Sequence, residues 1–435
     1  MRRFLRGFFT FLLVAVVISV FISNTIFDED YPILELDLDR FSDTRNQALE
    51  NVDFAVDLVH TTQYNYLWLT GKGDPGYSFL PVDVNFLRKL KSNAIVLSLS
   101  HLPVFNEKQE IRQDYAEALK RYYHSVRLSD EAREDEMKSL KIALIWLRPL
   151  TGFAEKQEAR AVDFLFQQMR FAHGLQKEGG SMLLTCSLAL PGVSERAIVQ
   201  SRFARIVFEA LRRLEKEEPA HNQRLLLVNA YEKDNLCRSG GELIQLLRKI
   251  VDQNNISGAP IRNIEKKIGI AIDVAALFAI WQDRGLPFYK NRQGDPLSQA
   301  QWVEEISKEF TERDFQGAIV KRHIKALLVS YYDPNRQKVG ELPYHYPFSR
   351  AQDSHRALDQ LRLVLKLYEL SSLRSDEGGT VVLQVPLREL FPVVHRTIKP
   401  LARAWNLYLM KDGADRWEYV YSFELVRRYL STYVR

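Results

Sequence analysis

Short apolar stretches that alternate with longer amphipathic ones restrict most strongly how this 435-residue chain can fold. Each stretch of strand length is followed by a segment with helical periodicity, for example Arg196–Lys216. This order is typical of βα units around a parallel sheet. The predicted strands are Ile33–Leu38, Asp53–Val59, Ala94–Ser100, Ile142–Leu147, Met182–Leu188, Leu225–Ala230, Ile268–Asp273, Ala326–Tyr331 and Thr380–Val385.

These nine strands are one more than a (β/α)₈ barrel needs, so we predict an α/β fold of the TIM-like barrel class, preceded by one N-terminal transmembrane helix. The surplus strand is expected in an insertion, as either Ala94–Ser100 or Ile142–Leu147. A doubly wound open sheet is the alternative. It usually has a Gly-rich turn after its first strand, and the segment Asp39–Asp43 contains no glycine.

We predict that the chain consists of an anchor followed by one domain. Residues 1–30 are expected to form a cytoplasmic tip and a transmembrane anchor, and residues 31–435 an exported barrel domain. An insertion is expected around 105–140, where Asn106–Leu140 is highly charged and is predicted to be helical. The C-terminal extension, 400–435, is rich in aromatic residues. It is predicted to pack as a last helix or a strand pair, or else to form a binding face.

The predicted anchor is Gly7–Phe27, which contains no charged residue and is long enough to cross a hydrocarbon core of about 30 Å. Arginines precede it and acidic residues follow it, so the N-terminus is expected to stay in the cytoplasm. This places the anchor in the bacterial inner membrane, as a single span, with the body in the periplasm. The alternative, a cleaved signal peptide, is disfavoured by the length of the apolar run and by the poor cleavage site at Ile22–Thr25.

Composition excludes several classes of function. The net charge of +5 is mild and no long basic block occurs, so nucleic acid is not an expected partner. The sequence contains no nucleophile elbow, P-loop, HExxH or CxxC motif. It therefore lacks the minimal motifs of acyl hydrolases, NTPases, zincins and thioredoxins. The two cysteines, Cys186 and Cys237, permit one disulfide or are two small buried apolar side chains.

Candidate functional residues are the polar ones at the carboxyl ends of the predicted strands, where barrels of this class carry their active sites. We expect Asp273 to form an acid/base pair with Asp37 or Asp39, although both of the latter could equally cap a helix. Expected substrate-binding residues are Asn229, Glu232, Trp281, Tyr331, Tyr332, Asp333 and Gln384. His60, His101 and the Asp353/His355 pair are further candidates, with structural roles as the alternative.

The segment Lys267–Ala276, an apolar strand that ends in Asp273, resembles the sixth strand of xylose-isomerase-like barrels, the superfamily that includes endonuclease IV. Leu225–Asn229 and Ser98–His101 are similar to its fifth and third strands, and Asp353–His355 to its Asp-x-His pair. The resemblance implies a metal site, but Asn229 stands where the family has a carboxylate and Ala276 where it has a histidine. Gln384 likewise replaces an expected Glu. These departures predict that the metal site is degenerate, so we expect no metal and no other cofactor.

A second resemblance covers only about residues 33–105. Leu34–Asp39 and Tyr77–Pro81 are similar to the start of the hydrolase barrel of exported poly-N-acetylglucosamine-processing proteins. It implies a carbohydrate substrate held by aromatic rings and a pair of carboxylates.

Two functions follow as expectations. The first is a membrane-anchored, exported barrel that binds or processes an envelope carbohydrate in the manner of a glycoside hydrolase. The second is a non-catalytic scaffold subunit of an envelope complex, derived from a barrel enzyme, with protein partners in place of a substrate. Convergence of Asp37, Asp39, Asp273 and Asp333 within about 5–10 Å would favour the first.

Overall fold

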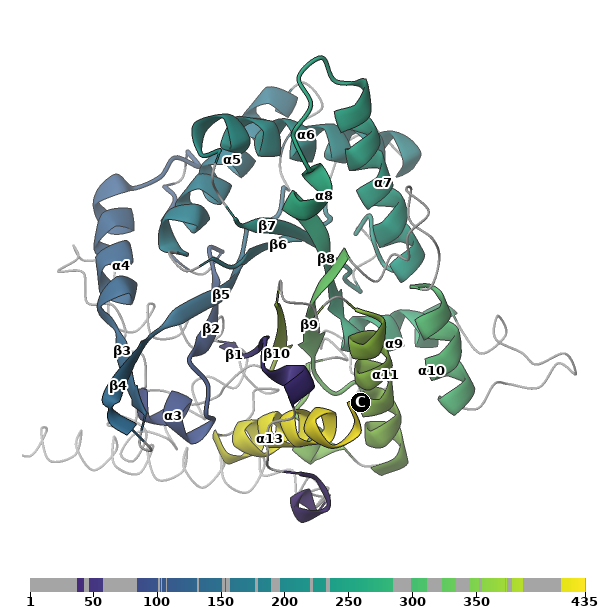
Figure 1. Ribbon diagram of the computed structural model, residues 1–435. Helices are drawn as coiled ribbons and strands as arrows, with labels where there is room; N and C mark the ends of the chain where they lie inside the picture. The colour runs from purple at the N-terminus through teal and green to yellow at the C-terminus, as the bar shows by residue number, and fades with distance from the viewer. Residues whose placement is uncertain are drawn as a thin grey trace, which may run out of the picture.

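The structure is a computed structural model (Figure 1). It describes residues 37–42, 47–57, 84–100, 102, 104–106, 108–130, 133–150, 153, 157–176, 179–188, 196–219, 222–231, 235–284, 299–310, 323–333, 345–351, 354–371, 373, 378–385 and 416–434. The predicted anchor, Gly7–Phe27, lies outside these residues. No helix among those described has the length and apolar character that a membrane crossing requires.

Eight parallel strands close into a barrel in the order β1-β10-β9-β8-β7-β6-β5-β2. This confirms the predicted barrel. The strands are buried runs of branched and small residues, as parallel strands covered on both faces are. Their bounds are β1 Val52–Asp57, β2 Ala94–Ser98, β5 Lys141–Trp146, β6 Ser181–Thr185, β7 Arg224–Val228, β8 Ile268–Asp273, β9 Ile324–Val329 and β10 Gly379–Leu383.

The surplus strand is the first predicted one. Leu38–Arg40 is a 3-10 helix, η1, whose N-cap Asp37 accepts the amide of Asp39, so this local hydrogen bond replaces strand pairing there. Residues 33–36 lie outside the described part of the chain. The expectation that Ala94–Ser100 or Ile142–Leu147 is surplus was wrong, because these segments form β2 and β5 of the barrel.

The charged insertion is only partly helical. It contains α4 (Gln113–Ser125) and then an antiparallel hairpin of β3 (Arg127–Asp130) and β4 (Arg133–Ser139), which leads directly into β5. The hairpin was not predicted, because its strands are short and highly charged.

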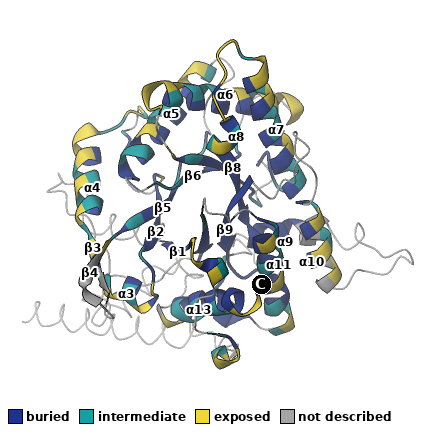
Figure 2. Cartoon of the chain, in the orientation of Figure 1, coloured by how far each residue is buried: buried dark blue, intermediate teal, exposed yellow. Residues whose placement is uncertain are grey.

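Helices surround the barrel and turn their apolar sides to it, and their outer sides are exposed (Figure 2). α6 ends within one residue of its predicted bound. The helices and the remaining short turns are α3 Val84–Lys89, α5 Glu158–Leu175, α6 Arg196–Glu217, α7 Gly240–Ile256, α8 Ile264–Lys267, α9 Val274–Arg284, α10 Gln299–Lys308, α11 Ser354–Leu370, α13 Arg416–Tyr433, η2 Gln47–Leu49 and η7 Phe348–Arg350.

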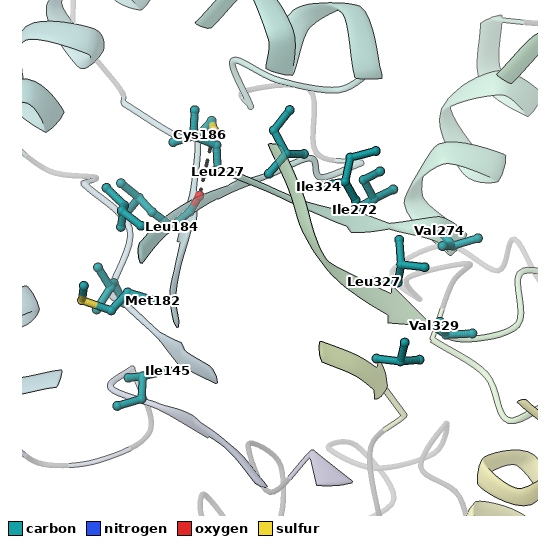
Figure 3. Packing of buried hydrophobic residues seen from close by; sticks show 14 of the residues in the cluster. Ile145, Met182, Leu184, Cys186, Leu227, Ile272, Val274, Ile324, Leu327 and Val329 are labelled. Carbon is teal, nitrogen blue, oxygen red and sulfur yellow. Dashed lines mark hydrogen bonds between the residues drawn. The ribbon is translucent and has the colours of Figure 1, made fainter. Parts of the chain in front are cut away.

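Two apolar layers separate along the strands, because successive side chains point to opposite faces. Outward residues such as Met182, Leu184 and Leu327 pack with the helices (Figure 3). A smaller inner cluster fills the barrel with Ala55, Ala94, Val96, Ala143, Leu144, Leu183, Leu226, Val228, Ala271, Ala326, Leu328 and Val382. This inner cluster fixes which polar residues point into the barrel above it.

The C-terminal extension contributes α13, which lies beside β1 and β10 (Figure 1). The Tyr419 hydroxyl accepts the Asp57 amide at 3.1 Å and donates to the Leu383 carbonyl at 3.2 Å, at the carboxyl ends of these two strands. In η7, Arg350 holds the same helix through a buried bidentate pair with Glu418, both bonds being 2.7 Å. The predicted last helix is therefore confirmed for Arg416–Tyr433.

Candidate functional site

A ring of polar side chains follows the inner apolar cluster at the carboxyl ends of the strands. Each member lies two residues after an inner-cluster residue on the same strand, so it points into the barrel. The ring contains two acids, one amide, three hydroxyls and one indole: Asp57, Asp273, Gln384, Ser98, Thr185, Ser330 and Trp146. Trp146, Thr185 and Gln384 are half-buried, and the other four are buried. We call these seven residues the mouth ring.

Asp273 is the best-anchored acid of the mouth ring. Its Oδ1 accepts the amide of Ala276 at 3.0 Å, in the first turn of α9, where a carboxylate is favoured by the helix dipole. Its Oδ2 lies 3.5 Å from Nε2 of His345. Only 6% of the Asp273 side chain is exposed, so the carboxylate depends on these neighbours for its stability.

His345 joins two strands of the barrel. Its Nδ1 lies 2.9 Å from the Ser330 hydroxyl, which follows β9, while its Nε2 faces Asp273 at the end of β8. The backbone of His345 is left-handed, with φ 79°, a conformation that costs energy in any residue with a side chain. The result is a line of serine hydroxyl, imidazole and carboxylate along the wall of the mouth.

Sequence reasoning did not single out His345. This residue lies in the long segment that follows the predicted strand Ala326–Tyr331. The contact with Asp273 depends on how that loop returns to the barrel, which no local pattern reveals.

Asn229, predicted to bind substrate, instead holds the backbone of Asp273. Its Nδ2 donates to the Asp273 carbonyl at 3.0 Å and its Oδ1 accepts the Asp273 amide at 2.8 Å. Asn229 is 1% exposed. It follows the inner residue Val228 directly, so it points along the rim toward β8 and ties the ends of β7 and β8 together.

Tyr331, Tyr332 and Asp333 lie beyond Ser330 but are buried beneath the loop that contains η7. Tyr331 pairs through its backbone with Tyr346, and its ring packs on Phe348 with 5.8 Å between centroids. The backbone of Tyr332 exchanges two hydrogen bonds with the Gln360 side chain. The two tyrosines therefore form part of the core instead of an open surface for a sugar ring.

Asp333 is 1% exposed, and its carboxylate is 3.8 Å from the Arg356 guanidinium. Gln384, by contrast, stands in the mouth ring as predicted from its place on the last strand. Its backbone amide donates to the Val329 carbonyl, and its side-chain Oε1 accepts no hydrogen bond within the described part of the chain. Gln384 is thus the predicted binding residue with a polar atom available to a ligand.

Asp57 is an acid of the mouth ring that sequence reasoning missed. The sequence contained a signal for it, because Asp53, Ala55 and Asp57 are two residues apart and so lie on one face of the strand. Burial, and secondarily the nearby Asp57 carboxylate, raise the pKa of Tyr419 above its ordinary value. At the other end of the barrel Asp53 pairs with Lys141 at 2.6 Å.

Asp37 and Asp39 lie beside α13, outside the mouth ring. Arg428 of α13 is 3.9 Å from Asp39, and Thr432 accepts the amide of Ser42. Thr432 is 13 residues along α13 from Tyr419, which marks the carboxyl ends of β1 and β10, and this corresponds to about 20 Å. The structure therefore does not bring Asp37 or Asp39 to Asp273, and both side chains are exposed.

The other sequence candidates are not placed in the mouth by the structure. Glu232, His60, His101 and Asp353 lie outside the described residues. Trp281 is on α9, but its side chain is also outside the description.

The described residues do not assemble the metal site of the resembled superfamily. No group of three or more His, Cys, Asp or Glu that could hold a metal occurs among the described residues. At the two departures from the family pattern, the Asn229 side-chain amide bonds to the backbone of Asp273, and the backbone amide of Ala276 donates to the Asp273 carboxylate that caps α9. Both positions thus serve to hold Asp273.

No protein-family model matches the chain, and no curated protein matches it by sequence. Similar solved structures include a xylose isomerase domain protein from Alicyclobacillus acidocaldarius, with 12% identity, 81% of this chain and 99% of that chain covered, and a TM-score of 0.39. An AP endonuclease of family 2 from Brucella melitensis has 10% identity, coverages of 80% and 98%, and a TM-score of 0.40. A psychrophilic family 10 endo-β-1,4-xylanase has 12% identity and a TM-score of 0.39, with 78% of this chain and 88% of that chain covered.

The similar structures found thus include xylose isomerase-type and AP endonuclease-type proteins, the kinds that the sequence resembles. At these identities and TM-scores the similarity carries no argument about ligand or reaction.

Proposed function

We propose that this chain is a membrane-anchored, exported barrel protein that binds an envelope carbohydrate in the mouth ring and processes it by acid/base chemistry. The observation that carries the proposal is the line of Ser330, His345 and Asp273 on the wall of the mouth. In place of the expected pair of aspartates, it puts an imidazole against a carboxylate.

The chemistry of this line is proton transfer. An imidazole between a hydroxyl and a carboxylate can accept a proton, and the carboxylate then stabilises the imidazolium. Because His345 is partly exposed, at 16% of its side chain, a bound ligand can reach the ring. Asp273 is held by Asn229 and Ala276 and would orient the imidazole.

Carbohydrate is the ligand class that the rest of the mouth ring favours. Sugar hydroxyls bond to carboxylate and amide oxygens, and sugar rings pack on aromatic faces. Gln384 supplies an amide oxygen without a hydrogen-bond partner among the described residues, and Trp146 is a half-buried indole in the same ring. Asp57 contributes a second carboxylate.

The membrane part of the proposal depends on Gly7–Phe27 and on the charges beside it. We propose a single span in the bacterial inner membrane with the body in the periplasm. The test is carbonate extraction of membranes, followed by protease treatment of spheroplasts. Retention in the pellet with digestion of the body supports this topology, whereas a protected body or a released chain contradicts it.

The mouth is tested by thermal shift of the purified chain with fragments of envelope polysaccharides, since a ligand of the native state raises the melting temperature. We expect a shift that is abolished or strongly reduced in His345→Gln and Asp273→Asn. Asn can still cap α9, so the second variant is expected to fold. The matched control is Asp37→Asn with Asp39→Asn, which removes two exposed acids outside the mouth ring and should keep the shift.

A scaffold role remains the second candidate function. It is favoured by the separation of Asp37 and Asp39 from Asp273, and by the burial of Tyr331 and Tyr332. A chain that shows no shift with any fragment, and whose His345→Gln variant retains its envelope partners in a pull-down, would favour the scaffold over the carbohydrate site.

A further inference from the structure

The two cysteines of the chain meet beside the barrel although 50 residues separate them. Cys186 directly follows β6, and Cys237 lies in the turn that precedes α7. Both are free thiols in the structure and both are 0% exposed. Figure 3 shows Cys186 beside Leu227, with a dashed line from its sulfur to the Leu184 carbonyl oxygen at 3.9 Å.

Their backbones are paired as in a sheet. The amide of Leu236, the residue before Cys237, donates to the Cys186 carbonyl at 2.7 Å, and Ser187 and Asn235 form an antiparallel bridge. In this register Leu236 lies opposite Cys186 and Cys237 is the next residue along, so the backbones of the two cysteines are adjacent across the pair, as a disulfide requires. The Asn235 side chain accepts the Cys237 amide at 2.8 Å, which fixes the turn.

The side chains also face each other. The thiols of Cys186 and Cys237 are within hydrogen-bonding reach, and burial together with this contact raises the pKa of Cys237. A buried thiol with a raised pKa reacts slowly, because the thiolate is the reactive form. A bond between these two sulfurs would therefore form during folding, before the barrel closes over them.

We propose that Cys186 and Cys237 form a structural disulfide in the mature protein. Each thiol loses its proton, the two sulfurs bond to each other, and the two electrons pass to a disulfide of an oxidising thiol-disulfide exchange partner, which is reduced to a dithiol. The proposal rests on the exported topology, because such oxidants persist in exported compartments. The bond closes a ring of about 50 residues that contains α6 and β7, and it ties the carboxyl ends of β6 and β7 beside the mouth.

The test begins with the full chain, isolated in membranes from its own cells without reductant. Acid quenching, alkylation with iodoacetamide in denaturant and peptide mass spectrometry then report the thiols. We expect both cysteines to escape alkylation unless dithiothreitol is added first, and a linked peptide lighter by about two hydrogens than its two parts. Alkylation of both cysteines without reductant overturns the proposal.

A second measurement separates the disulfide from the other proposals. Reduction in denaturant and refolding with dithiothreitol should lower the melting temperature by roughly 3–8 °C relative to refolding with oxidised glutathione. The variant Cys186→Ala with Cys237→Ala should have the same melting temperature in both buffers. An equal melting temperature of the wild-type chain in both buffers contradicts a structural bond. Neither result depends on whether a sugar binds in the mouth, and free thiols in a chain of proven periplasmic topology would refute the disulfide alone.

Discussion

Replacement of Asn229 distinguishes a structural role from the substrate-binding role that sequence predicted. In Asn229→Ala the amide and the carbonyl of Asp273 each lose a hydrogen-bond partner in a buried place. An unsatisfied buried polar group costs about 1–3 kcal/mol, so two of them should lower the free energy of unfolding by about 2–6 kcal/mol. This is a large part of the stability of an ordinary domain, which is roughly 5–15 kcal/mol.

The assay is urea denaturation of the purified chain, with the free energy of unfolding obtained from the midpoint and the slope. The matched control is Asn255→Ala, an exposed asparagine of α7, which should change the free energy by less than about 0.5 kcal/mol. A stable Asn229→Ala variant that loses only the ligand-induced shift would refute the reasoning and restore Asn229 to the binding site.

Asn229→Asp refines the same experiment. The carboxylate can still accept the Asp273 amide, but when ionised it cannot donate to the carbonyl, and it adds a buried charge close to Asp273. Burial raises the pKa of such a carboxyl in the folded state. The decrease in the free energy of unfolding of Asn229→Asp should therefore be large at pH 7, and it should shrink as the pH falls and the group protonates. A pH-independent loss between pH 4 and 8 would contradict this account.

Three further outcomes are expected. Glu418→Gln removes the charge partner of the buried Arg350 and should lower the free energy of unfolding by about 3–5 kcal/mol, measured by urea denaturation. Burial raises the pKa of Tyr429 to about 12, so the unfolded state loses this proton first above about pH 10. Stability should therefore fall from pH 10 to 12, and less steeply in Tyr429→Phe, as melting temperatures against pH will show. Asp37→Asn with Asp39→Asn should leave both the melting temperature and any sugar-induced shift within error of the wild-type values, since both acids are exposed.

The barrel could be predicted because each strand is a local signal. A continuous apolar run such as Ile268–Asp273 is buried on both faces, and its length and flanking helix identify it without any knowledge of its neighbours. Ile33–Leu38 was predicted as a further strand because alternating Leu and acidic residues satisfy the same pattern, but the barrel closes without it. What decides there is that Asp37 bonds to the amide of Asp39 and starts a 3-10 turn. The pattern could not weigh that bond against strand pairing.

The candidate site was predicted less well than the fold. Asp273 and Gln384 were found because both end a strand and point inward. Asn229 and Tyr331 also follow strands, but each comes one residue after an inward position, so it turns to the rim or to the outer core. Applying the two-residue alternation from the inner cluster would have separated these cases and would also have found Asp57. His345 was beyond such reasoning, because its approach to Asp273 depends on the return of a loop.

The neighbours of Asp273 explain how this buried acid can remain in the barrel. A buried carboxylate needs compensating partners, and a metal would supply them by its charge. Here the amide of Ala276 and the dipole of α9 compensate Oδ1, and His345 faces Oδ2 at 3.5 Å. Asn229 has the geometry to hold the backbone because an amide can both donate and accept, which a carboxylate cannot. Asp273 is thus held in place by Asn229 and by the first turn of α9, with the His345 imidazole beside its carboxylate.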